Sequence, residues 1–265
     1  MPEMFGVLHL VLLAAATGAA VWGAVRAKRL DDACRIKLLT ACGWLLAATE
    51  VYKQMFLFYI VNDGVYDWWY FPFQLCSVPM YLCVLLPLLA RPAHNMMAAD
   101  NGSSRKAYSA ALTFMAGFTL VSSAAALIYP QDFLRPYVTL TMHGFIWHGL
   151  LLFISLVISL SGMADLSRRG IGRSVLLFLG LCLVAVGINA FAEPYMAEAY
   201  SAGLIRNQYA AMFYLNPYHL SPQPFVGSIQ KSAGIPIGLA LYIAVIISVS
   251  VMVDLGLRKL LCRHK

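Results

Sequence analysis

Seven apolar segments, each about as long as a membrane span, constrain this chain more than any other feature of its sequence. Hydrophobic residues make up 61% of the 265 residues and charged residues 12%, a balance that a water-soluble domain does not need. Because a transmembrane helix takes about 20 apolar residues, the sequence predicts an all-α membrane protein, with residues 1–265 as a single polytopic domain. The third and sixth segments are short, so six spans remain an alternative to seven. The segments are Phe5–Val25, Leu38–Ile60, Phe71–Leu89, Ala107–Ile128, Val138–Leu160, Val175–Phe191 and Ile235–Leu255.

Basic residues are distributed unevenly between the predicted loops. Most of the 19 lysines and arginines follow the first, third, fifth and seventh segments, whereas the opposite loops hold only Arg135, Arg206 and Lys231. Because basic loops stay on the cytoplasmic side, this bias predicts seven spans with the N-terminus outside and the C-terminus inside. The basic residues do not gather on one soluble domain, so binding of nucleic acid is not expected.

The six cysteines predict no structural disulfide and no metal site. None of them lies in a predicted outer loop, where oxidation is expected, and none has the spacing of a metal-binding pair. Two fall on the predicted cytoplasmic side and four within spans; they are Cys34 and Cys262, and Cys42, Cys76, Cys83 and Cys182.

The third span opens with a proline-flanked cysteine, Cys76. Pro72 suits the first position of a helix, and Pro79 cannot donate to the carbonyl of Leu75, which predicts an irregular helix beside Cys76. The positive end of a helix dipole favours a thiolate, whereas burial in lipid opposes it. Taken alone, Cys76 is compatible with simple packing, and Cys83, on the same face, is expected to belong to the core.

Two pairs of polar residues within the predicted spans are further candidates for function. Glu50 and Lys53 are three residues apart and can pair on one helix face, either to fix helix packing or to act directly in function. His143 and His148 are five residues apart, about 140° around a helix, so they do not face one metal ion together. Either histidine could face Cys76.

The predicted topology brings these groups to similar depths. At 1.5 Å per residue, Cys76 lies about 7 Å, Lys53 about 10 Å and His148 about 15 Å below the outer face. Asn189 lies near the outer end of the sixth span. A thiol with an imidazole in reach forms a nucleophile–base pair. The long outer loop at about 192–234 is expected to pack on the bundle or to act as a lid.

Several short motifs together resemble the YwaF-like bacterial integral membrane proteins and the related eukaryotic transmembrane protein 164. They are Glu50-Val51-Tyr52-Lys53, Pro72-Phe73-Gln74-Leu75-Cys76, Phe145-Ile146-Trp147-His148-Gly149, Asn189 and the segment Asn207–Tyr214. The eukaryotic relative is described as an acyltransferase that moves fatty acyl groups between phospholipids, with a cysteine and a histidine in the roles matched here by Cys76 and His148. The resemblance implies a bacterial cytoplasmic membrane protein.

Together, the candidate residues and the resemblance predict a lipid acyltransferase or ester hydrolase that uses no cofactor or metal. Cys76 would form an acyl-enzyme from a phospholipid ester with His148 as its base, and a lysophospholipid or water would accept the acyl group. Asn189 would orient the histidine or bind the oxyanion, while Glu50 and Lys53 would support the bundle. The alternatives are a small-solute or ion transporter built on the Glu50–Lys53 pair, a seven-span metal hydrolase and a scaffold without chemistry.

Overall fold

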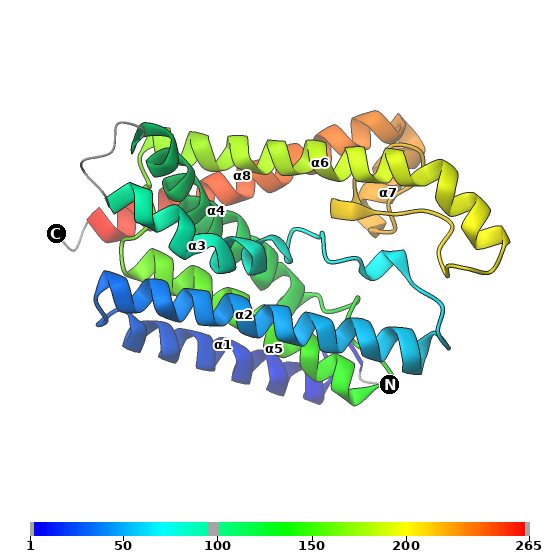
Figure 1. The fold of residues 1–265 in the computed structure, drawn as a ribbon, viewed down its shortest axis with the longest axis horizontal. Helices are drawn as coiled ribbons and strands as arrows, with labels where there is room; N and C mark the ends of the chain where they lie inside the picture. The colour runs from blue at the N-terminus through cyan, green and yellow to red at the C-terminus, as the bar shows by residue number, and fades with distance from the viewer. Residues whose placement is uncertain (1–2, 95–100, 263–265) are drawn as a thin grey trace. The chain divides into compact units, whose positions relative to one another are not determined.

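The computed structural model describes residues 3–94 and 101–262, and in this part of the chain it is all-helical (Figure 1). A π-helical turn, Leu57–Val61, extends the second helix, and two 3₁₀ turns lie at Trp68–Tyr70 and Met212–Tyr214. The described residues form no β-strand, only one isolated bridge between Tyr66 and Ile205. The α-helices are α1 Val7–Ala27, α2 Asp32–Phe56, α3 Val78–His94, α4 Asn101–Ile128, α5 Val138–Leu160, α6 Arg168–Ser201, α7 Pro224–Ala233 and α8 Ile235–Cys262.

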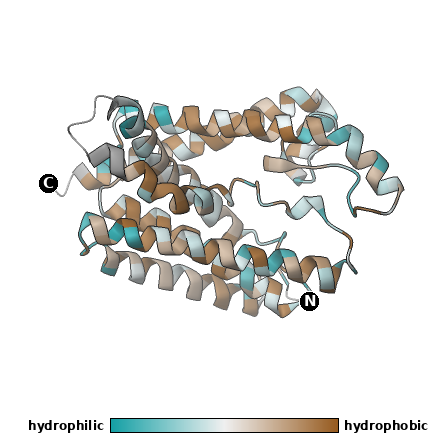
Figure 2. Cartoon of the chain, viewed as in Figure 1, coloured by the Kyte–Doolittle hydropathy of each residue, from teal (hydrophilic) through white to brown (hydrophobic). Residues whose placement is uncertain are grey.

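Each of the seven predicted segments overlaps a helix, and α5 coincides with its predicted segment, Val138–Leu160. Within the described residues, five helices are long and apolar enough to cross a membrane: α1, α4, α5, α6 and α8. Hydrophobic residues dominate these helices in Figure 2. The chain therefore has the architecture of a multi-pass membrane protein. The helix α3, with 17 residues, is shorter than a typical span.

The chain divides into two compact units. The first holds residues 1–49, 78–177 and 249–265, and the second holds residues 50–77 and 178–248. In the first unit α5 packs against both α1 and α4, and α3 packs against α4. Small residues allow the helices to approach closely, as where a Cβ added to Gly149 of α5 would lie 3.2 Å from the Cβ of Ala16 in α1.

The beginning of the third helix differs from the prediction. The helix α3 starts at Val78 rather than near Pro72, and residues 74–77 form a turn. Pro79 is therefore the second residue of α3, where the missing N–H of proline leaves no hydrogen bond unmade. The expectation of a helix made irregular by Pro79 is wrong, and the depth of Cys76 cannot be counted along a helix, because Cys76 precedes α3.

The sixth helix also differs from the prediction, because it extends ten residues beyond Phe191 and includes Pro194. The predicted outer loop is consequently shorter. It runs from the end of α6 through an irregular segment to α7, which begins with Pro224 at its first position.

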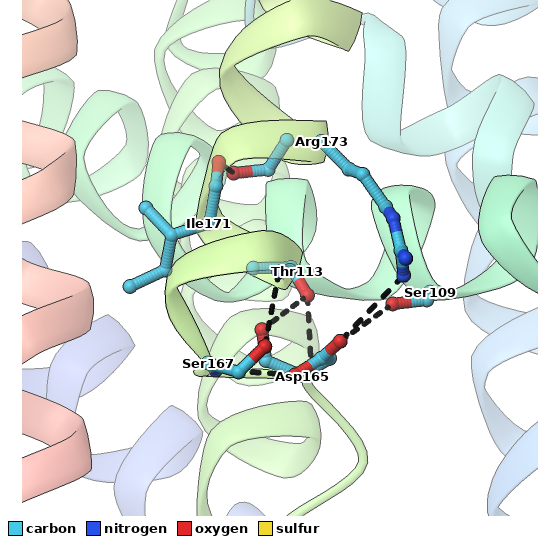
Figure 3. A network of polar contacts seen from close by, with 8 residues as sticks. Ser109, Thr113, Asp165, Ser167, Ile171 and Arg173 are labelled. Atoms are coloured by element: carbon cyan, nitrogen blue, oxygen red, sulfur yellow. Dashed lines mark hydrogen bonds and ion pairs between the residues drawn. The ribbon is translucent and has the colours of Figure 1, made fainter.

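The connection between α5 and α6 is held to α4 by a polar network (Figure 3). Thr113 of α4 accepts a hydrogen bond from the Asp165 backbone N–H at 3.1 Å and donates one to the Asp165 carbonyl at 3.3 Å. The Asp165 carboxylate accepts from Ser109 at 3.4 Å and lies 3.8 Å from the Arg173 guanidinium. Ser167 caps α6 by accepting from the N–H of Gly170 at 3.1 Å.

Gly170 is the position in this connection that tolerates no side chain. A Cβ at Gly170 would overlap the backbone carbonyl of Asp165, whereas a Cβ at Gly172, two residues along α6, meets nothing within 4 Å. We expect Gly170→Ala to destabilise the protein by about 1–3 kcal/mol, as overpacking does, and Gly172→Ala to leave stability unchanged. Thermal unfolding of the two purified variants in detergent measures the difference. Equal midpoints would contradict this account of the connection.

The Asp165 network also predicts an acid-sensitive contribution to stability. A hydrogen bond from the Ser167 hydroxyl, then the Ser167 N–H and the Arg173 charge, hold the pKa of Asp165 below its ordinary value of 3.8, against the opposing effect of burial. Because the pKa is lowered in the folded state, the contribution is present above pH 3.8 and is lost as the pH falls through the folded-state pKa. Unfolding midpoints measured from pH 6 to about pH 3 should fall less steeply for Asp165→Asn than for the wild type. If the midpoints of the wild type and Asp165→Asn fell in parallel, Asp165 would not contribute to the loss of stability in acid.

Candidate functional site

The segment that carries Cys76 lies in the second unit, immediately before α3. Cys76 occupies a turn and is half-buried. The Ser77 N–H closes this turn by donating to the carbonyl of Gln74 at 2.8 Å. The turn leaves the thiol two residues ahead of the first residue of α3, outside the regular helix.

Two side-chain amides, which we call the amide clamp, hold the backbone of residues 211–213. Gln74 donates from Nε2 to the carbonyl of Ala211 at 3.0 Å and accepts at Oε1 from the N–H of Phe213 at 2.8 Å. Asn189 of α6 donates from Nδ2 to the Met212 carbonyl at 3.1 Å and accepts at Oδ1 from the Met212 N–H at 2.8 Å. Three consecutive residues of the irregular segment are thereby fixed from both sides.

The clamped backbone is strained and buried. Phe213 and Tyr214 have φ angles of 55° and 57°, in the left-handed region that bulky side chains rarely adopt. Met212 and Phe213 are buried, and the Phe213 ring packs against Phe73 with 5.6 Å between ring centroids. Such a conformation persists only where its surroundings determine it. The clamp supplies those surroundings, and through Gln74 it fixes the segment that carries Cys76.

The other end of this segment is held by the last turns of α2. Gln54 donates from Nε2 to the Tyr70 carbonyl at 2.5 Å and to Oε1 of Glu50 at 2.7 Å. Lys53 Nζ lies 2.8 Å from the other Glu50 oxygen, so the predicted Glu50–Lys53 pair is confirmed. Glu50 is buried with both oxygens engaged, which offsets the cost of placing its charge there.

His148 lies in the first unit, in the middle of α5. Its Nδ1 is 2.8 Å from the carbonyl of Gly144, one turn earlier, and its ring stacks on Phe133 with centroids 4.9 Å apart. Because a carbonyl only accepts, Nδ1 is the donor, and in the neutral ring Nε2 is then the basic nitrogen. The imidazole has the tautomer and the fixed orientation that a general base needs.

The other histidines of the described chain have different surroundings. His143 is half-buried, and its ring lies 5.5 Å from that of Trp147. His9 is fully buried, with Nδ1 accepting from the Phe5 N–H and Nε2 donating to the Leu127 carbonyl, both at 2.9 Å. Both nitrogens of His9 are therefore occupied by the backbone, which makes it a packing residue.

Several residues of these networks give no signal in the sequence. Asn189, expected to orient the histidine or to bind the oxyanion, bonds the Met212 backbone with both polar atoms of its amide. Gln74 and Gln54 were missed, because neutral amides give no signal until their distant partners are known. His219 lies with Nε2 2.5 Å from Oε1 of Glu193, and its ring stacks on Tyr209 with 4.1 Å between the ring centroids. Within the described residues no three His, Cys, Asp or Glu side chains could share a metal ion.

The surroundings of each group limit what it can do chemically. Cys76 offers a thiol on an anchored turn, and His148 offers a basic nitrogen on a rigid helix. Cys83, by contrast, is fully buried in the first unit against Met115, with the two sulfurs 3.6 Å apart, so its predicted place in the core is confirmed.

Comparison with known proteins found one family. The model of the TMEM164 family matches residues 4–253, nearly the whole chain. No curated protein and no solved structure matches the sequence.

The amide clamp predicts that Gln74 and Asn189 stabilise the same segment. Gln74→Leu or Asn189→Leu leaves one backbone N–H and one carbonyl unmet, at a cost of about 1–3 kcal/mol each. The double variant should lose less than the sum of the two losses, since the first substitution already frees the segment. Chemical unfolding in detergent measures the coupling, with Gln208→Leu, at an exposed glutamine, as the control. Additive losses would show that the two amides act independently.

Proposed function

We propose that this chain, which belongs to the TMEM164 family, is a membrane enzyme that moves or releases a fatty acyl group of a phospholipid, with Cys76 as the nucleophile and His148 as the base. The observation that carries the proposal is the family match across residues 4–253. The anchored turn that presents Cys76 and the tautomer of His148 support it.

The proposed reaction proceeds in two steps. His148 takes the thiol proton at Nε2, the Cys76 sulfur bonds to the ester carbonyl carbon, and the ester C–O bond breaks. The departing oxygen of the lysophospholipid takes the proton back from His148. In the second step His148 takes the proton of a lysophospholipid hydroxyl or of water, and the oxygen bonds to the thioester carbonyl carbon. The C–S bond breaks, and the Cys76 sulfur takes the proton back from His148. The proposal requires the thiol and the imidazole to come within hydrogen-bonding reach.

The remaining candidate residues take supporting parts in this proposal. Glu50, Lys53 and Asn189 position the chain around Cys76 through the contacts described above, without touching the substrate. His143 stays the alternative base. The membrane topology that we propose has seven spans, α2 and α3 completing the five long apolar helices, with the N-terminus outside, the C-terminus inside and the lipid entering from the outer leaflet of a bacterial cytoplasmic membrane.

The alternatives find less support. A transporter built on Glu50 and Lys53 needs charged groups that can meet a solute, but the Glu50 carboxylate is buried and already engaged by Lys53 and Gln54. A scaffold without chemistry gives no reason for the anchored turn at Cys76.

The reaction can be tested by lipid mass spectrometry. Purified protein is incubated with a phospholipid and an isotopically labelled lysophospholipid, and labelled diacyl product and free fatty acid are measured. Cys76→Ala should lower product formation by at least about 10³-fold, as loss of a nucleophile does. Cys34→Ala, at an exposed cysteine, is the matched control. Full activity in Cys76→Ala would exclude the mechanism.

The same assay separates the two histidines of α5. His148→Gln should reduce the rate strongly without unfolding the protein, whereas His143→Gln should leave most of it. The reverse order would assign the base to His143.

A further inference from the structure

The last helix carries a carboxylic acid that the proposed reaction does not use. Asp254 lies in the first unit, within the apolar run of α8, and is fully buried. Neither of its carboxylate oxygens has a hydrogen-bond partner among the described residues. Burying an ionised carboxylate in this way costs far more than burying a neutral acid. A carboxyl group so placed in a membrane span is expected to serve a function.

Asp254 packs directly on the backbone of α4. A Cβ added to Gly117 would lie 2.7 Å from Oδ1 and 2.8 Å from Oδ2 of Asp254, so any side chain at this position would displace the carboxyl group. The glycine thus makes the space that the acid occupies. Because the carboxyl group lies directly against this backbone, the contact suits a ligand as small as a proton.

No charged group on the two helices offsets a negative charge at Asp254. On α8, Ser250 lies one turn away on the same face; it is fully buried, and its hydroxyl also has no hydrogen-bond partner among the described residues. Arg258, one turn in the other direction, is exposed and forms no ion pair with Asp254. On α4, Thr113 and Ser109, one and two turns before Gly117, are uncharged, and Lys106, on the same face but about 16 Å away along the helix axis, is exposed.

These two α4 residues connect the buried acid to the polar network at the α5–α6 connection. Ser109, Thr113 and Gly117 are spaced by four and lie on one face of α4. Thr113 and Ser109 are the residues that bond Asp165 (Figure 3). Thr113 and Gly117 are separated by about 6 Å along the helix axis. Polar side chains therefore run from the Asp165–Arg173 pair to Thr113, four residues before the glycine that lies against Asp254.

We propose that Asp254 is a proton-binding site, loaded along the Ser109–Thr113–Gly117 face of α4 from the side of the Asp165 connection. The ligand is a proton rather than a metal cation. A cation such as Na⁺ needs several oxygen ligands, whereas the carboxyl group here lies against a glycine backbone. The site is separate from the proposed acyl transfer and does not depend on Cys76.

Infrared spectroscopy of the protein in phosphatidylcholine vesicles tests the site directly. At neutral pH the wild type should show the C=O stretch of a protonated carboxylic acid. This band should shift when the protein contains ¹³C-labelled aspartate, a measurement that needs no variant. It should be absent in Asp254→Asn and retained in Asp165→Asn and Cys76→Ala. The absence of a labelled-aspartate acid band in the wild type, or its retention in Asp254→Asn, would overturn the proposal.

Two further measurements test the ligand and the route. Replacing choline chloride in the buffer with NaCl should leave the acid band unchanged. Loss of the band in NaCl would show that the site binds a metal cation instead. After transfer to D₂O, the shift of the band caused by deuterium should be several-fold slower in Thr113→Val than in the wild type. Thr119→Val, at a buried threonine two residues beyond Gly117, is the control. Equal exchange in Thr113→Val and the wild type would exclude the α4 route.

Discussion

The segment that carries Cys76 depends on two neutral amides, Gln74 and Asn189, that hydrogen-bond the backbone of residues 211–213. A buried irregular backbone has polar groups that no helical hydrogen bonds satisfy, and each of them needs a partner. The clamp provides them. It also determines a left-handed conformation at Phe213 that the local sequence does not favour. A thiol can act as a positioned nucleophile only if its turn is fixed, so the proposed chemistry rests on these four hydrogen bonds.

Glu50 and Asp254 illustrate two ways of burying a carboxyl group. Glu50 lies 2.8 Å from Lys53 Nζ and accepts a hydrogen bond from Gln54, so the buried carboxyl group has fixed polar partners. Asp254 has no such partners in the described chain and packs on Gly117. The first arrangement positions the site, and the second suits a group that binds a proton. The difference lies in the neighbours, since Glu50 meets a lysine and a glutamine, whereas Asp254 meets a glycine.

Much of the helix pattern follows from the sequence alone, because lipid requires long apolar stretches and a satisfied backbone. The bounds of α5 and the Glu50–Lys53 pair are examples, since both rest on spacing within one helix. The start of α3 could not be predicted, because Gln74 bonds a segment 137 residues away in the sequence and leaves the helix unformed before Val78. Asp254 lies inside the predicted span Ile235–Leu255, so the sequence shows an acid there but not its surroundings. Its missing partners, and the glycine that makes its space, are properties of neighbouring helices.

The central claim is that a phospholipid acylates Cys76, and the most direct test is to detect the thioester. Purified protein is mixed with a phospholipid in the absence of acceptor and quenched in acid, and its peptides are analysed by mass spectrometry before and after treatment with neutral hydroxylamine. The account predicts a fatty acyl group on the peptide containing Cys76, released by hydroxylamine and absent when His148 is replaced by glutamine. An unmodified Cys76 under conditions of active turnover, with acyl groups found elsewhere or nowhere, would contradict it.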